Sequence, residues 1–388
     1  MLLYFDILHI LFPIGTLYPS QQGGPSNTIY WLAKGLVAKS ISVTSVSTSL
    51  GAEHAVEAGK WLNTDYGRVI YLKARFHQLP FRMIACAERQ IENCDCVHLN
   101  SLFYPPSFLL AILAVLKKKP VIWSCRGNLD PEALRYSKWK KGSVLWLIRN
   151  FLSGGRTTFH ATSETEKKHI HSHFGGNTRV AVIPNYMELP EAVERKQAEP
   201  PYLLYVGRLH PVKALDRLIG ALARSRAFID SGFVLKIAGD DRHGYRKALE
   251  ELAGQLGISE KVHFLGHVEG AEKQQLYADA YFSILPSHTE NFGNVVIESL
   301  AQGTPVIASR GTPWEVLENK KAGIWSQNDP LSLSNSIERT FCLSEAEYQQ
   351  YRRRSHSIVQ KCFNIHKNIS VWQDTFQFIL RNPGFNDS

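Results

Sequence analysis

The sequence has few of the features that mark a secreted, disulfide-linked or membrane-spanning protein. Six cysteines are scattered among 388 residues without a disulfide framework, and Cys94-Asp95-Cys96 has no second pair at zinc-binding spacing. The longest apolar patch, residues 107–116, is too short to span a bilayer, and residues 1–5 lack the basic start of a signal peptide. These absences favour a reducing cytoplasm and predict no transmembrane segment.

Several common binding motifs are also missing. The chain contains no Gly-x-Gly-x-x-Gly fingerprint, no Walker P-loop and no Gly-x-Ser-x-Gly nucleophile elbow. A dehydrogenase is therefore disfavoured. Short-period repeats and low-complexity segments are absent as well.

Length and charge limit the remaining choices. The composition, 44% apolar and 20% charged, is that of an ordinary globular protein, and the length predicts two domains. Residues 1–195 hold 22 Lys and Arg against 14 Asp and Glu, a net charge of +8, whereas residues 196–388 hold 22 against 21. The basic half suggests an anionic partner, either an acidic polymer, a lipid-linked phosphate or an anionic membrane surface. Nucleic acid is the weaker alternative because no nucleic-acid motif accompanies the charge.

Apolar runs alternate with helix-like segments in both halves, which predicts two doubly wound parallel α/β sheets. The expected domains are residues 1–190 and 202–365, joined by a polar, Pro-bounded linker at 191–201, with a further helix at 366–388. Residues 158–162 are expected to form the last strand of the first half. Residues 139–152 predict an amphipathic helix that contacts a membrane or, more commonly, docks on its own sheet.

A strand–loop–helix–strand unit over residues 281–309 is the strongest functional signal. Glu290 lies in its loop and Glu298 about one turn into its helix, so both carboxylates can face the start of the helix. Backbone N–H groups there favour phosphate, and Gly293 lets a ligand approach the chain closely. Carboxylates can accept hydrogen bonds from hydroxyl groups, and backbone amides can donate to phosphate. A site that offers both fits a nucleotide sugar.

Further candidates follow predicted strands. Arg208 and Lys213 can place two positive charges on a diphosphate, although alone they would be ordinary surface cations. Gly23-Gly24 can hold a phosphate or form a plain tight turn. Ligands of open α/β sheets lie beyond the carboxyl ends of strands. Four more residues are therefore cleft candidates: His98, Asn100, Arg126 and Asn128.

Together these motifs resemble a known family. The carrying residues are Gly207-Arg208-Leu209…Lys213, the Glu290-x-Phe292-Gly293-x-x-x-x-Glu298 block, the Gly23-Gly24 loop and His160-Ala161-Thr162-Ser163-Glu164…Val182-Ile183-Pro184-Asn185. They are similar to glycosyltransferase family 4, retaining glycosyltransferases of the GT-B fold. The similarity covers essentially the whole chain. It implies two Rossmann-like domains facing across a cleft, with the last helix crossing back to the first domain.

The resemblance also implies a role for each residue. Glu298 would accept hydrogen bonds from the donor ribose, Arg208 and Lys213 would bind the diphosphate, and Glu290 would hold the transferred sugar. Backbone amides of Asn291, Phe292, Gly293, Asn294 and Val295 would assist, and the segment with His263 and Gly266 would frame the base. The acceptor or phosphate side would comprise Gly23, Gly24, His98, Asn128 and His160.

Two positions depart from the family pattern. Arg126 stands where many relatives have a histidine near the reacting sugar, and Tyr186 replaces the usual glycine after the Pro-Asn turn. The family's chemistry implies transfer with retention, with no cofactor or metal; the chain has no Asp-x-Asp pair to hold a divalent ion. The departing phosphate would take the proton of the acceptor hydroxyl, and the enzyme would supply charge and positioning, with Arg126 among the catalytic candidates.

Two other function classes stay open at this point. A nucleotide-sugar epimerase can share the architecture, and a non-catalytic binder of anionic polymers would also explain the basic half. The preferred acceptor is a glycan or lipid-linked glycan of cell-surface polysaccharide or lipopolysaccharide assembly, at the inner face of the membrane.

Overall fold

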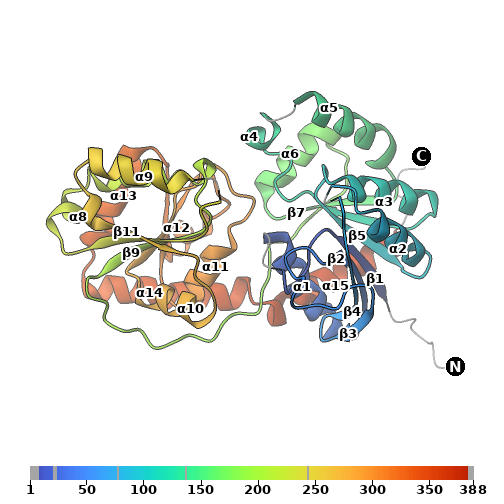
Figure 1. Ribbon diagram of the computed structural model, residues 1–388, viewed down its shortest axis with the longest axis horizontal. Helices are drawn as coiled ribbons and strands as arrows, with labels where there is room; N and C mark the ends of the chain where they lie inside the picture. The colour runs from blue at the N-terminus through green and yellow to red at the C-terminus, as the bar shows by residue number, and fades with distance from the viewer. Residues whose placement is uncertain (1–7, 21–23, 77, 136–137, 243, 383–388) are drawn as a thin grey trace. The chain divides into compact units, whose positions relative to one another are not determined.

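The chain divides into two compact units, each built around one sheet. The computed structural model describes residues 8–20, 24–76, 78–135, 138–242 and 244–382. The first unit comprises Met1–Glu188 and Ile365–Ser388, and the second comprises Leu189–Asn364. Figure 1 shows helices against the sheet of each unit, as the strand–helix alternation predicts. No helix in the described part of the chain has the length and apolar character needed to cross a membrane.

The sheet of the first unit has eight strands in the order β3-β4-β2-β1-β5-β6-β7-β8. The short strand β3 pairs antiparallel with β4, and the other neighbours are parallel. The strands are β1 (His9–Ile14), β2 (Ser42–Thr48), β3 (Trp61–Thr64), β4 (Gly67–Leu72), β5 (Cys96–Asn100), β6 (Val121–Ser124), β7 (Thr157–Ala161) and β8 (Val180–Val182).

Helices cover both faces of this sheet because neighbouring strand residues point to opposite sides. Ile10 and Phe12 of β1 pack with α1 and α15, whereas Leu11 packs with α2, α3 and α6. The helices are α1 (Gly24–Val37), α2 (Phe81–Ile91), α3 (Pro105–Leu116), α4 (Pro131–Arg135), α5 (Lys138–Leu147), the π-helical turn η1 (Ile148–Leu152), α6 (Glu164–Phe174) and α15 (Ile365–Arg381).

The second unit has six strands in the order β11-β10-β9-β12-β13-β14, and all neighbours are parallel. Its strands are β9 (Tyr202–Val206), β10 (Val234–Ala238), β11 (Val262–Gly266), β12 (Phe282–Leu285), β13 (Val306–Ser309) and β14 (Gly323–Ser326). Its helices are η2 (Pro211–Lys213), α7 (Leu215–Leu222), α8 (Arg226–Asp230), α9 (Tyr245–Gln255), η3 (Ser259–Lys261), α10 (Gly270–Asp279), α11 (Asn294–Ala301), α12 (Val316–Asn319), α13 (Pro330–Phe341) and α14 (Glu345–Cys362).

Three of the features that differ from the sequence-based expectation lie in the first unit. The last strand of the first sheet is β8, not residues 158–162, because β8 adds one more parallel pairing at the edge. Strand β3 was not predicted, because its four residues do not form a long apolar run. They are stabilised by antiparallel pairing with β4. The expected helix at 139–152 changes to π-helical geometry at Ile148.

Candidate active site

The unit singled out by the sequence forms as predicted at the carboxyl end of β12. A loop after Leu285 leads into α11, and Gly303 follows the end of that helix with φ +72°. Gly293 begins the helix with φ +84°, and a Cβ there would lie 2.9 Å from Leu285 Cδ2. Gly293 is needed because its φ is positive and because a side chain would collide with Leu285. The turn therefore packs directly on the strand end and presents the start of α11 at the sheet edge.

Strand β9 lies next to β12 in the sheet, and this neighbour relation brings two predicted site residues together. Lys213, in the short helix η2, donates a hydrogen bond to the Glu290 carboxylate. Both side chains are largely shielded, with 14% and 18% exposed. Backbone bonds from His288 N to Val212 O (2.9 Å) and from Glu290 N to Gly311 O (3.0 Å) hold the loop in place. The site thus contains a cation paired with a carboxylate.

Glu298, in the first turns of α11, is held by two side chains of the neighbouring helix α10. Lys273 Nζ lies 3.1 Å from one carboxylate oxygen, and the Tyr277 hydroxyl donates to the other at 3.1 Å. Tyr277 is buried, and burial followed by the Glu298 charge raises its pKa well above the usual value. Lys273 and Tyr277 were missed by the sequence reasoning; their i, i+4 spacing on a helix is the signal that could have found them.

The cation Arg208 differs from Lys213. It lies two residues after the end of β9, its side chain is exposed, and within the described ranges it makes no ion pair. The backbone beside Arg208 packs closely against Gly239. A Cβ at Gly239 would lie 1.8 Å from Gly207 O, so no side chain fits there. The ends of β9 and β10 therefore approach closely only because Gly239 has no side chain. Arg208 is available to an anionic ligand at this edge.

The predicted amide segment, Asn291–Val295, comprises the turn before α11 and its first residues. Phe292 is buried against Trp314, with ring centroids 5.1 Å apart. The Trp314 indole donates to the Phe292 carbonyl oxygen at 2.5 Å. Trp314 thus fixes the backbone of the turn, and it is a second support that the sequence reasoning missed.

A small cavity of about 150 Å³ lies at the carboxyl ends of β10 and β11, and Leu209, which follows Arg208 in the chain, lines part of it. Gly266 and Phe264 line it, with the Arg246 guanidinium 5.0 Å from the Phe264 ring centroid. His263, predicted to frame the base, does not line this cavity; its Nε2 lies 3.1 Å from Glu260 O. Of the two residues predicted to frame the base, Gly266 alone lines the cavity.

In the first unit, His98 is buried in the middle of β5, and His160 is buried one residue before the end of β7. His98 Nε2 and His160 Nδ1 each lie 2.7 Å from Ser124 Oγ, and His160 Nε2 lies 2.8 Å from Ile183 O. The Trp372 ring covers both imidazoles, at 5.2 and 4.7 Å. Burial lowers the pKa of His160 to about 3 and that of His98 well below its usual value. Two neutral histidines therefore join strands beneath α15 and present no surface to a ligand.

Arg126 has strained geometry and strong hydrogen bonds. Its φ is +55°, a conformation that disfavours residues with a side chain. Nε donates to Asn100 Oδ1 at 3.2 Å, and the guanidinium donates to Asn185 Oδ1 at 2.9 Å. Its remaining Nη2 is buried without a hydrogen-bond partner in the part of the chain that the structure describes. Burial lowers the pKa of Arg126 to about 10, so it stays charged at neutral pH.

The remaining first-unit candidates have structural contacts or are incompletely described. Asn128 Oδ1 accepts from Ser101 Oγ (2.8 Å) and Leu102 N (2.6 Å), which fixes the loop after β5. Gly24 is the first residue of α1, and its carbonyl accepts from Thr28 Oγ1 at 2.9 Å. Gly23 lies outside the described residues. Among the residues that the structure describes, no three His, Cys, Asp or Glu side chains form a group that could hold a metal ion.

Comparisons with known proteins place the chain among glycosyltransferases. An uncharacterized glycosyltransferase of Methanocaldococcus jannaschii is 35% identical over 151 residues, 38% of this chain and 37% of the relative. The chain spans less than half the length of the curated relatives it matches.

Solved structures match over nearly the whole length. Sucrose-phosphate synthase from Thermosynechococcus elongatus has a TM-score of 0.77 at 18% identity, covering 96% of this chain and 99% of that one. Anabaena HepE in complex with UDP-glucose has a TM-score of 0.71 at 19% identity, covering 95% and 100%. At such low identity these matches show the fold.

Family models match both halves of the chain in order. The model described as Glycosyltransferase Family 4 matches residues 22–189, and that described as Glycosyl transferases group 1 matches residues 188–355. The predicted family and the two Rossmann-like α/β sheets are thereby confirmed. The chain has the GT-B fold and belongs to the group 1 glycosyltransferases of glycosyltransferase family 4.

Proposed function

We propose that the protein is a retaining, metal-independent glycosyltransferase that moves a sugar from a nucleotide-diphosphate sugar to a hydroxyl group of a glycan or lipid-linked acceptor. The observation that carries this proposal is the arrangement at the carboxyl ends of β9 and β12. There Glu298 is oriented by Lys273 and Tyr277, while the Lys213–Glu290 pair lies on the neighbouring loop. Carboxylates that can accept hydrogen bonds from hydroxyl groups and a cation that can donate to phosphate thus lie at one sheet edge.

Each group has a role that follows from its charge. Glu298 would accept from the ribose hydroxyls, and its two protein partners leave further lone pairs on the carboxylate for them. Arg208, exposed beside Gly207, would bind the diphosphate together with Lys213. Glu290, released from Lys213 by the incoming phosphate, would accept from hydroxyls of the transferred sugar. Binding of the nucleotide sugar would thus replace the Lys213–Glu290 ion pair by a contact between Lys213 and phosphate and by hydrogen bonds between Glu290 and the sugar.

The reaction would break the bond between the sugar's anomeric carbon and the diphosphate oxygen. The acceptor oxygen would form the new bond on the same face, and the departing diphosphate would take the acceptor's proton. Lys213 and Arg208 would stabilise the negative charge that develops on the leaving group. Arg126 is charged, and its Nη2 has no hydrogen-bond partner among the residues that the structure describes; it is proposed as a further electrostatic group for this step.

The donor nucleotide is proposed to be UDP, because HepE, of the same fold, is known in complex with UDP-glucose. The acceptor is proposed to be a cell-surface polysaccharide or lipopolysaccharide intermediate. The net charge of +8 on residues 1–195 favours a phosphate-bearing or membrane-bound acceptor. All six cysteines are free, in keeping with a reducing, cytoplasmic location.

Contact with an anionic membrane is supported by the helix α5 and the turn η1. Three aromatic side chains there are strongly exposed: Trp139 (93%), Trp146 (60%) and Phe151 (67%). Exposed Lys140 and Arg149 lie on the same segment. Exposed aromatic rings beside cations are the composition of a helix that binds the lipid interface. We propose that this surface attaches the enzyme peripherally to the inner face of the membrane.

A screen of UDP-, GDP- and ADP-sugars by thermal shift tests the proposed donor, since a ligand that binds only the folded state raises its stability. Product analysis with and without a glycan acceptor then tests transfer. Transfer to the acceptor with retained anomeric configuration is expected. Conversion of the free nucleotide sugar in the absence of acceptor would identify an epimerase instead, and an unconsumed nucleotide sugar would identify a binding protein.

A further inference from the structure

A second hollow, of about 600 Å³, lies at the other end of the strands of the second unit. Tyr202 is the first residue of β9, and Phe233 and Tyr281 directly precede β10 and β12. Because these strands are parallel, all three residues lie at their amino ends. A five-residue strand spans about 17 Å, so this hollow is separate from the candidate donor site at the carboxyl ends.

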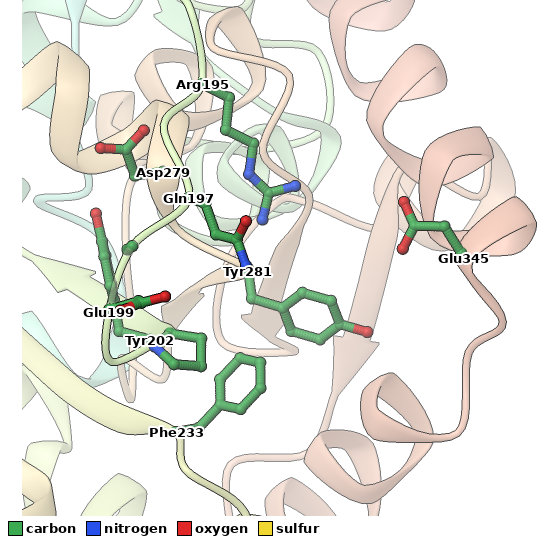
Figure 2. A pocket seen from close by; sticks show the side chains of 10 residues that line it. Arg195, Gln197, Glu199, Tyr202, Phe233, Asp279, Tyr281 and Glu345 are labelled. Carbon is green, nitrogen blue, oxygen red and sulfur yellow. The ribbon is translucent and has the colours of Figure 1, made fainter.

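Aromatic rings form one wall of the hollow. Phe233 and Tyr281 lie edge to face with centroids 5.3 Å apart, and Tyr281 also packs on Tyr348 at 4.4 Å. The Tyr281 hydroxyl donates to Thr340 O at 2.6 Å, which fixes the ring. Figure 2 shows the Phe233 and Tyr281 rings between the chain segment that carries Arg195 and the helix that carries Glu345. The wall is rigid and apolar.

The opposite side is formed by residues 195–201, which were predicted to be a linker. Neighbouring contacts fasten this segment to the second unit: Val193 N donates to Gln302 Oε1 at 2.9 Å, and Lys196 N donates to Asp279 Oδ1 at 2.6 Å. The Arg195 guanidinium lies 5.3 Å from the Tyr348 ring centroid. The segment is thus an ordered part of the pocket.

Charged groups of both signs face the hollow. Arg195 is a donor, whereas Glu199, Asp279 and Glu345 are acceptors. Among the charged side chains of the lining, Arg195 alone would attract an anionic ligand, and three carboxylates would repel it. A simple cation would be attracted by the carboxylates but repelled by Arg195, and it has no group that accepts a hydrogen bond from Arg195 or Gln197. Sugar hydroxyl groups both donate and accept, and the C–H faces of a sugar ring pack on aromatic rings.

We propose that this hollow is a second carbohydrate-binding site, which holds a neutral or amino-bearing segment of a glycan chain away from the donor site. Its volume lies in the range of ordinary ligand pockets, and aromatic walls with a few convergent polar groups are their usual lining. The inference rests on the proposed function only for the source of the glycan. Such a site would retain a long acceptor on the enzyme between successive transfers.

Binding of four probes to the full-length protein tests the proposal by isothermal titration calorimetry. They are maltohexaose (neutral), a chitosan hexamer (amino-bearing), hexagalacturonate (acidic) and spermidine (a cation without hydroxyl groups). Maltohexaose or the chitosan hexamer is expected to bind, and hexagalacturonate and spermidine are expected not to. Arg195→Ala and Glu345→Gln should each weaken binding about tenfold or more, the loss of one charged hydrogen bond. Lys196→Ala, the matched control, removes a cation from the same segment outside the lining and should leave binding unchanged.

The rise in melting temperature on adding a nucleotide sugar, measured for the same variants, distinguishes this proposal from the proposed function. The shifts should equal those of the wild type, because the variants lie at the far end of the strands. Failure of both neutral and amino-bearing probes to bind, stronger binding of the acidic or cationic probe, or equal affinity in all variants would overturn the proposal. A missing shift in the wild type would count against the donor site instead.

Discussion

Lys213 and Glu290 form an ion pair although 77 positions separate them in the chain. Both belong to loops that follow neighbouring strands, β9 and β12. The pair holds a cation and a carboxylate ready at the position where the proposed donor would bring phosphate and hydroxyl groups. Its largely shielded geometry means that neither charge can be removed without affecting the other.

Glu290→Gln keeps the shape of the side chain but removes its charge. Turnover should fall by about 100-fold, the scale seen for losing one electrostatic contact in a transition state. Donor affinity should change less than turnover, because Lys213 gains freedom to bind the diphosphate. Steady-state kinetics with Lys213→Met and the double variant would measure the coupling. Fully additive effects of the two changes would contradict a shared role.

Glu298→Gln should act on binding. Loss of the charged acceptor for the ribose should weaken donor affinity about tenfold or more, with a smaller effect on turnover. Tyr277→Phe keeps the ring and removes only the hydroxyl that orients Glu298, so a few-fold loss of affinity is expected. Calorimetric titration with the nucleotide sugar checks both. Unchanged affinity in Glu298→Gln would remove this residue from the site.

Arg126→Met replaces a charged side chain by an apolar one of similar length. We expect turnover to fall by about 100-fold, while donor affinity measured by titration stays near that of the wild type. Arg126→Lys restores the charge without the two-sided hydrogen bonding to Asn100 and Asn185, and should recover part of the rate. Near-normal turnover in Arg126→Met would show that this residue only supports the fold.

His160 makes the stability of the protein sensitive to acid. Its pKa is about 3 in the folded state against an ordinary value of 6.5, so the unfolded chain binds the proton more tightly. The stability contributed by the neutral imidazole is present above pH 6.5 and is lost, at about 1.4 kcal/mol per pH unit, as the pH falls from 6.5 toward 3. His160→Gln should unfold at a lower temperature at pH 7 but lose less stability between pH 7 and 5.

Calorimetric melting at both pH values tests this linkage. His54→Gln, at an exposed histidine, is the matched control and should keep the pH dependence of the wild type. If His160→Gln and the wild type lose equal stability on acidification, the buried imidazole is not the responsible group.

The exposed aromatic residues on α5 and η1 should determine membrane attachment. Sedimentation with vesicles of phosphatidylcholine and phosphatidylglycerol should show binding that weakens with salt. A Trp139→Ala/Trp146→Ala variant should lose about tenfold or more of this affinity, since each ring contributes buried apolar area. Phe378→Ala, which removes an exposed aromatic ring from α15, should bind as the wild type does. Equal binding of all variants would refute the proposed surface.

Local patterns were sufficient for most of the architecture. The apolar run, the glycines and the helix start of residues 281–309 predicted β12, the loop and α11, because short strands and helix ends depend on neighbouring residues. Strand β3 could not be predicted in the same way. Its stability comes from pairing with β4, which a segment of only four residues, two apolar and two polar, does not reveal.

Side-chain partners were harder to predict than elements. His98 and His160 follow the pattern of cleft residues at strand ends, yet Trp372, more than 200 positions after His160, covers both. The i, i+4 spacing of Lys273 and Tyr277 places both on one face of a helix, but it does not name their partner, which depends on α10 packing beside α11.

The sequence by itself determined the family, the two sheets and the residue types of the candidate donor site. Only the tertiary structure decided which of those residues touch. The strand order β10-β9-β12-β13 places β12 directly beside β9, and this brings the loop with Glu290 to Lys213. Strand order follows from burying apolar faces across the whole sheet, a long-range balance that no local pattern contains.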